Sequence, residues 1–103
     1  MNESFITPPG HVKFRAKKLF DAAGEVAGGS IAFLEPGGGG PVPPHTHSHD
    51  HLFIVTRGAV CIEVGGKTVI VGAGDAFRVD GRELHSVWND SDGETVMVGL
   101  TVN

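Results

Sequence analysis

The feature that most constrains the fold is a succession of short strand-like segments separated by turn residues. Each segment is rich in β-branched or aromatic residues and is bounded by Gly, Asn or Asp, a pattern typical of strands joined by tight turns. Helical spacing of apolar residues is interrupted by glycine wherever it begins, so no helix is expected. These patterns predict strands at residues 52–56, 59–64, 67–71, 75–79, 84–88 and 94–102, with two N-terminal strands at about 12–20 and 26–34.

Many short antiparallel strands with glycine-rich turns indicate an all-β fold, either a sandwich or a small barrel. The Gly-Gly pair at 65–66 predicts a two-residue hairpin, and Asp80-Gly81 predicts a second turn. Within 59–64 the two valines and the isoleucine share one face, so the other face, with Cys61, is expected to be the wetter one. The Gly- and Pro-rich segment 35–44 is expected to be a loop.

Composition limits the class of protein. A chain of 103 residues is long enough for one domain. Eight Lys and Arg against twelve Asp and Glu give a net charge of −4, which argues against nucleic-acid or membrane partners. One cysteine excludes a disulfide framework. No stretch approaches the ~20 apolar residues of a membrane-spanning helix, and no signal-peptide pattern opens the sequence, so a cytoplasmic location is expected.

Four histidines alternate with other residues within a short tract: His45, His47, His49 and His51. In a straight strand the first and last rings would be ~20 Å apart, too far to share an ion at ~2.0–2.1 Å. Either there is no common ion, or the chain bends. A bend at residues 48–50 would let His45 and His47 converge with His51 and would turn His49 outward. His85, on another strand, could then face them. Imidazole is a common metal ligand, so the tract predicts a metal site.

The same residues resemble two motifs of the cupin family. The first motif, G-x5-H-x-H-x(3–4)-E-x6-G, is matched over residues 39–58, with histidine at position 51 in place of glutamate. The second, G-x5-P-x-G-x2-H-x3-N, is matched over residues 74–89, with Asp80 and Arg82 in place of proline and glycine. The matched positions are Gly39, His45, His47, His51 and Gly58 in the first motif, and Gly74, His85 and Asn89 in the second.

The resemblance implies one cupin domain over residues 1–103, a jelly-roll-like double-sheet β-barrel, and a homodimer. It also implies one divalent transition metal per chain, held by His45, His47 and His85 with His51 as fourth ligand. Imidazole ligands suit Mn, Fe, Ni, Co, Cu or Zn. Because all four are neutral, the ion would keep its full charge and favour anionic ligands such as carboxylates or enolates. The Asp80-Gly81 pair supplies its own turn chemistry, so the hairpin should survive the two departures.

Strand parity predicts the walls of the pocket around the metal. Phe53 and Val55 share the face of His51, and Val87 shares that of His85. Further lining is expected from Val60, Ile62, Phe77 and Val79. No residue in this set is a general base, so the catalytic residues are unknown. His11 and His49 are expected to face solvent.

Two classes of function fit this pattern. One is a metal-dependent enzyme acting on a small molecule, such as a dioxygenase or an isomerase, because open coordination positions above an apolar pocket suit such chemistry. The other is a non-catalytic module that senses or stores a small ligand or a metal, because acid–base residues are missing.

Overall fold

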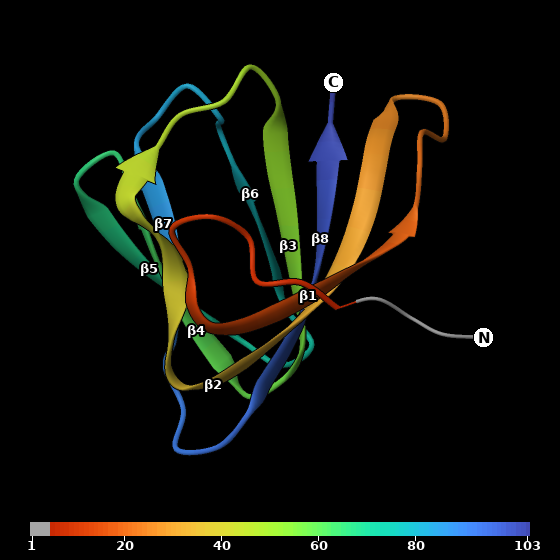
Figure 1. Ribbon diagram of the computed structural model, residues 1–103. Coiled ribbons are helices and arrows are strands. Elements are labelled where there is room, and N and C mark those ends of the chain that lie inside the picture. Colours follow the sequence, from red (N-terminus) through yellow and green to blue (C-terminus); the bar gives the residue numbers. More distant parts are fainter. Residues whose placement is uncertain (1–4) are drawn as a thin grey trace.

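The computed structural model describes residues 5–103 and contains eight β-strands (Figure 1). All the pairings between them are antiparallel. The strands are β1 (Val12–Phe20), β2 (Val26–His45), β3 (Asp50–Arg57), β4 (Ala59–Val64), β5 (Lys67–Gly72), β6 (Ala76–Val79), β7 (His85–Asn89) and β8 (Thr95–Val102).

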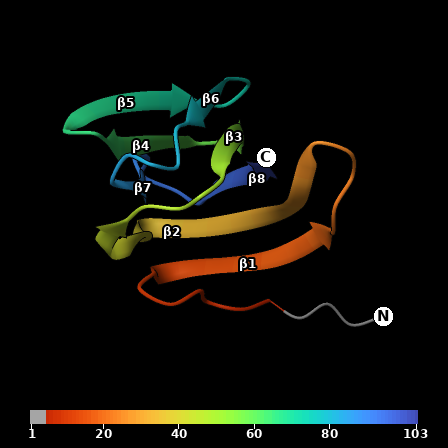
Figure 2. The ribbon, with the colours of Figure 1, turned by 90° about the horizontal axis from the view of Figure 1, so that it is seen from above.

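One sheet contains all the strands and curls into a nearly closed barrel. Its order is β5-β4-β7-β2-β8-β3-β6, and β1 pairs with β2 outside this path. Seen from above, β1 and β2 lie side by side on one side of the molecule, opposite β4 and β5 (Figure 2). The expected all-β, jelly-roll-like barrel is therefore confirmed.

The strand pattern of the sequence is reproduced closely. Each predicted strand coincides with an observed one to within two residues at either end, except at the C-terminal end of β2. Gly65 and Gly66 form the tight turn between β4 and β5, with Val64 opposite Lys67. In β4 the predicted alternation is confirmed, since Val60 and Ile62 are fully buried.

The segment 35–44 belongs to a strand, so the prediction of a loop is wrong. β2 is 20 residues long and runs through the whole segment. It pairs with β1 and β8 along its first part and passes to β7 at its end, where His45 lies opposite His85. The first histidine of the tract is therefore the last residue of this long strand.

Close packing of backbones explains the glycines in β2. A Cβ added at Gly38 would overlap the carbonyl oxygen of Lys13 in β1, and one at Gly39 would overlap that of Val87 in β7. Glycine is needed here for close approach of neighbouring strands rather than for a turn. Pro41, Pro43 and Pro44 fall in the register shift just before the end of β2, where regular pairing with β7 is interrupted. Composition alone could not distinguish these two uses.

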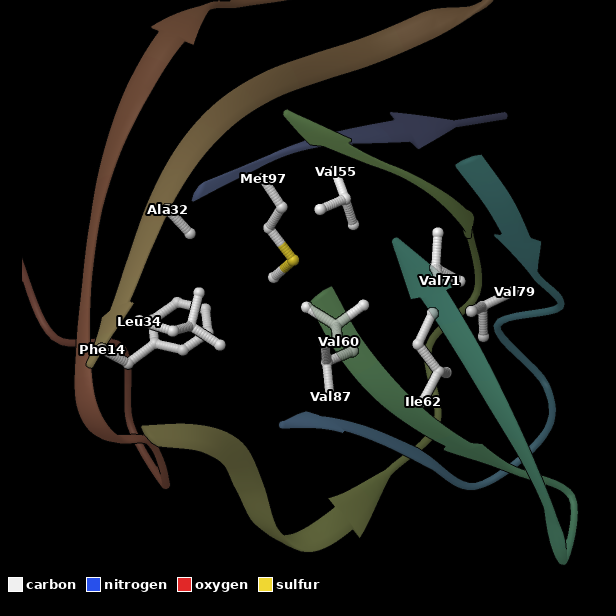
Figure 3. Packing of buried hydrophobic residues seen from close by; sticks show 10 residues of the cluster. All are labelled: Phe14, Ala32, Leu34, Val55, Val60, Ile62, Val71, Val79, Val87 and Met97. Atoms are coloured by element: carbon white, nitrogen blue, oxygen red, sulfur yellow. The ribbon is translucent and has the colours of Figure 1, made fainter. Parts of the chain in front are cut away.

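The hydrophobic core fills the inside of the barrel (Figure 3). Its members come from strands on both sides, including Leu34 of β2, Val55 of β3 and Ile62 of β4, all fully buried. Burial of such side chains contributes about 1.5–3 kcal/mol each relative to exposure. The core therefore stabilises the barrel strands that position the histidines.

Candidate metal centre

Three imidazoles from two distant parts of the sequence converge in the structure. The ligand atoms of His47, His51 and His85 all lie within 4.8 Å of one another. The ring centre of His47 is 4.9 Å from that of His51 and 5.1 Å from that of His85. Two nitrogens on opposite sides of one ion lie about 4.2 Å apart, so small side-chain rotations would bring this group around a metal.

A bend in the chain brings His47 and His51 together, which is one of the two alternatives that the spacing left open. The backbone bends at Ser48 and His49 before β3 begins at Asp50. The amide of His47 donates a hydrogen bond to the carbonyl of Gly81 at 2.6 Å. The amide of Gly81 in turn donates to the Asp50 carboxylate at 3.1 Å. The turn of the second motif thus holds both ends of the bend in the first.

The departures from the second motif preserve that turn. The Glu83 amide donates to the Asp80 carbonyl at 3.0 Å and closes the turn. The Asp80 carboxylate accepts hydrogen bonds from the backbone amide and the guanidinium of Arg82. These bonds lower the pKa of Asp80 to about 2, so the carboxylate stays ionised. The predicted turn at Asp80-Gly81 is confirmed.

His85 is held in the tautomer that a metal ligand needs. It is 3% exposed, and its Nδ1 lies 2.9 Å from the carbonyl oxygen of Glu83. A carbonyl oxygen can only accept, so Nδ1 carries the proton and Nε2 keeps its lone pair. A hydrogen bond from the second ring nitrogen to a backbone carbonyl is common among metal-binding histidines.

Desolvation favours the neutral form of the other two rings. Desolvation lowers the pKa of His51 to about 4, with smaller contributions from His47 and His85. Desolvation also lowers the pKa of His47, again with help from neighbouring histidines. A histidine must be deprotonated to bind a metal, so both shifts favour the form that binds.

The remaining two histidines of the tract lie outside this group. His45 is exposed at the end of β2, and its ring centre is 6.5 Å from that of His47. It lines the same cavity, although its ligand atoms are not among those that converge. His49 lies in the bend, where its Nδ1 contacts the Ser48 hydroxyl at 3.2 Å. The structure thus assembles three of the four expected ligands.

The three imidazoles stand on the wall of a cavity of about 390 Å³. Of the residues expected to line it, Phe53 and Val87 do so, and Phe14 and Met97 add further apolar surface. The other expected residues belong to the hydrophobic core or pack against it. These are Val55, Val60, Ile62 and Val79, which are fully buried, and Phe77, which is partly buried.

The N-terminal segment also contributes to the cavity, which sequence reasoning missed. Pro8, Pro9 and His11 line it together with Pro41 of β2. His11 is half-buried here, so the expectation that it faces solvent is wrong. No local pattern marks this placement, because it depends on a hydrogen bond from Val42 to the carbonyl of Gly10.

The fold places this chain among the small jelly-roll-like β-barrels, and it carries a group of histidines at an apolar cavity. The cupin domain family matches residues 30–102, which is well over half of the chain. This protein belongs to the cupin family. No match was found among curated proteins. Within residues 5–103 there is no helix long and apolar enough to cross a membrane.

Solved structures share the fold at low sequence identity. A protein from Thermotoga maritima, described as a predicted oxalate decarboxylase, is 20% identical, with a TM-score of 0.82 over 97% of this chain and 90% of its own. A cupin-2 domain protein from Rhodospirillum rubrum is 16% identical, with a TM-score of 0.81 over 97% and 69%. The polyketide cyclase RemF from Streptomyces resistomycificus is 22% identical, with a TM-score of 0.78 over 98% and 72%.

Proposed function

We propose that this cupin binds one divalent transition metal and uses it to act on a small molecule. The observation that carries the proposal is the convergence of His47, His51 and His85 on one wall of an apolar cavity. His45, which lines the same cavity opposite His85, is the proposed fourth ligand.

The donor set fits a transition metal of the group Mn, Fe, Co, Ni, Cu or Zn. Three neutral imidazoles suit these ions, whereas Mg and Ca prefer oxygen ligands. A bound ion would act as a Lewis acid toward an oxygen atom of the substrate. The chain's own part is to hold the ligands in place through Gly81 and Glu83, and to keep water away with apolar walls.

The proposed reaction class is that of a dioxygenase or an isomerase. Support comes from an apolar cavity large enough for a small organic molecule next to the histidine group. Two solved structures of similar fold bear the names of enzymes, a polyketide cyclase and a predicted oxalate decarboxylase. At about 20% identity these names show only that the fold can serve in enzymes.

A non-catalytic module that senses or stores a ligand is the second candidate. Among the described residues that line the cavity there is no Asp, Glu, Lys or Arg, so carboxylate and amine acid–base groups are missing. One structure of similar fold is the cupin domain of an XRE family transcriptional regulator from Enterobacter cloacae, at 18% identity and a TM-score of 0.76.

The metal content of the purified chain tests the proposed site. Elemental analysis of the wild type is expected to find about one transition metal per chain, which is lost in His51→Ala and His85→Ala. His49→Ala is the matched control, because His49 belongs to the same tract but lies outside the converging group. A metal-free wild type, or retention of the metal in both variants, would contradict the proposal.

Turnover separates the enzyme from the binding module. Fe-, Mn- and Ni-loaded protein is tested for oxygen consumption or product formation on diketones, flavonols, phenols and sugar derivatives. Turnover with any of these supports an enzyme, and silence with every metal alongside tight ligand binding supports the module.

We further propose a small-molecule ligand, a homodimer and a cytoplasmic location. The net charge of −4 supports a partner other than nucleic acid or an anionic membrane. The dimer rests on the family resemblance. Sedimentation of the purified chain tests it, and a monomer at micromolar concentration would contradict it.

A further inference from the structure

His11 is a cavity residue that the metal site does not use. It directly precedes the first residue of β1, and its ring centre is 4.5 Å from that of Phe14. The preceding residue, Gly10, is tied to β2 because its carbonyl accepts a hydrogen bond from Val42 at 2.8 Å. The imidazole is therefore held at the cavity wall by its packing against Phe14 and by the backbone hydrogen bond between Val42 and Gly10.

One hydrogen bond fixes the tautomer of this imidazole. Nδ1 of His11 lies 2.9 Å from the carbonyl oxygen of Pro9, and that oxygen can only accept. Nδ1 therefore carries the proton, and Nε2 of the neutral ring keeps its lone pair. Among residues 5–103, no hydrogen bond occupies Nε2. A neutral imidazole with a free Nε2 can accept a proton.

The rest of the cavity wall offers few other groups that could exchange a proton with a ligand. Beyond the three converging imidazoles and His45, His11 is the one titratable side chain among the described residues of the wall. The remaining surface is apolar, with Phe14, Phe53 and Met97 among its members. Apart from the metal proposed at the histidine group, the described part of the wall carries no Asp, Glu, Lys or Arg, so a charged molecule would lose its hydration before it reached the metal, and a neutral one enters more easily.

We propose that His11 is the proton acceptor for a small neutral enol or phenol that binds in this cavity. In this step the O–H bond of the ligand breaks and an N–H bond forms at Nε2 of His11. The electron pair stays on oxygen, which gives an enolate or phenolate beside an imidazolium. Net charge is conserved, and no oxidant or reductant is needed. The inference rests on the proposed function, because the oxyanion is expected to face the three-imidazole group.

The test counts the protons that leave the complex when a ligand binds. Catechol is a suitable probe, because a phenol has a pKa of about 10 and is neutral at pH 7. The full chain is loaded with Zn²⁺, which has no redox chemistry of its own. Calorimetric titrations in two buffers with different ionisation enthalpies give the number of protons released. His11→Asn keeps a donor for the Pro9 carbonyl but removes the base.

The wild type is expected to release about one proton fewer than His11→Asn, because His11 keeps the proton that the variant loses to buffer. His11→Gln serves as a second variant in case the first folds poorly, and His49→Asn should behave as the wild type. Equal proton release in wild type and both His11 variants overturns the inference, as does failure of catechol to bind.

Zinc content of the same samples separates the two proposals. Absence of zinc contradicts the metal site, whereas bound zinc with equal proton counts contradicts only the role of His11.

Discussion

The amide of His47 donates a hydrogen bond to the carbonyl of Gly81 across 2.6 Å, and this bond joins the two halves of the histidine group. Gly81 is buried in the turn that precedes β7, whereas His47 lies in the bend that precedes β3. This backbone contact, with the hydrogen bond from the Gly81 amide to Asp50, connects the segment that supplies two imidazoles to the segment that supplies the third.

Replacing Gly81 should disrupt this arrangement. A Cβ at position 81 would overlap the carbonyl oxygen of His49, so the bend must shift. We expect Gly81→Ala to lower the free energy of unfolding by about 2 kcal/mol and to reduce metal binding. Urea denaturation and elemental analysis measure the two effects. Gly72→Ala is the control, since a Cβ there meets nothing within 4 Å, and equal behaviour of the two variants would count against the prediction.

The stability of the metal-free protein should fall in mildly acidic solution because of His51. Burial lowers the pKa of His51 from 6.5 to about 4, so the unfolded chain binds the proton more readily than the folded one. The free energy of unfolding should therefore decrease as the pH falls from 6.5 toward 4, and be unaffected by this group above pH 6.5. Urea denaturation with a chelator present measures the slope.

The matched variant for this experiment is His51→Gln, which removes the titrating group and keeps a polar side chain. Its stability should decline less steeply over the same pH window than that of the wild type. Parallel curves for the two proteins would show that His51 is not the source of the slope.

His45 should contribute less to metal affinity than the converging histidines. Its ring is exposed and lies outside the preassembled group, so binding must first order its side chain. We expect His45→Ala to weaken metal affinity about tenfold, whereas His47→Ala abolishes binding. Competition with a chromophoric chelator gives both affinities. Equal losses of metal affinity in the two variants would contradict the prediction, because His45 would then contribute as much as His47.

The barrel core should be sensitive at Leu34, which is fully buried between the strands. Leu34→Ala leaves a cavity and should lower the free energy of unfolding by about 2–5 kcal/mol. Leu84→Ala makes the same chemical change at a side chain that is 60% exposed, and should cost about 0.5 kcal/mol or less. Denaturation midpoints compare the pair, and similar values would mean that Leu34 does not pack as described.

Much of the local structure could be read from the sequence, because it depends on neighbouring residues. The alternation of Val60 and Ile62 with Cys61 gave the buried face of β4, and the glycines at 65 and 66 gave its hairpin. The bend between His47 and His51 was one of two alternatives that distance left open, since rings on a straight strand lie too far apart to share one ion.

Contacts between strands were harder to predict. Gly38 and Gly39 have the composition of a turn, yet their role is to admit two neighbouring backbones at close range. His11 has no local pattern at all, because its place at the cavity depends on how the N-terminal segment pairs with β2.

The sequence by itself determined most of the strands, the positions of the tight turns and the side chains with metal-binding chemistry, but not the second half of β2. Periodicity and residue type act over a few residues, so these properties are local. Only the tertiary structure brings His85 close to His47 and His51. It also leaves His45 outside that group and places His11 in the cavity lining. Those relationships depend on the register between distant strands, which is set by packing of the whole barrel.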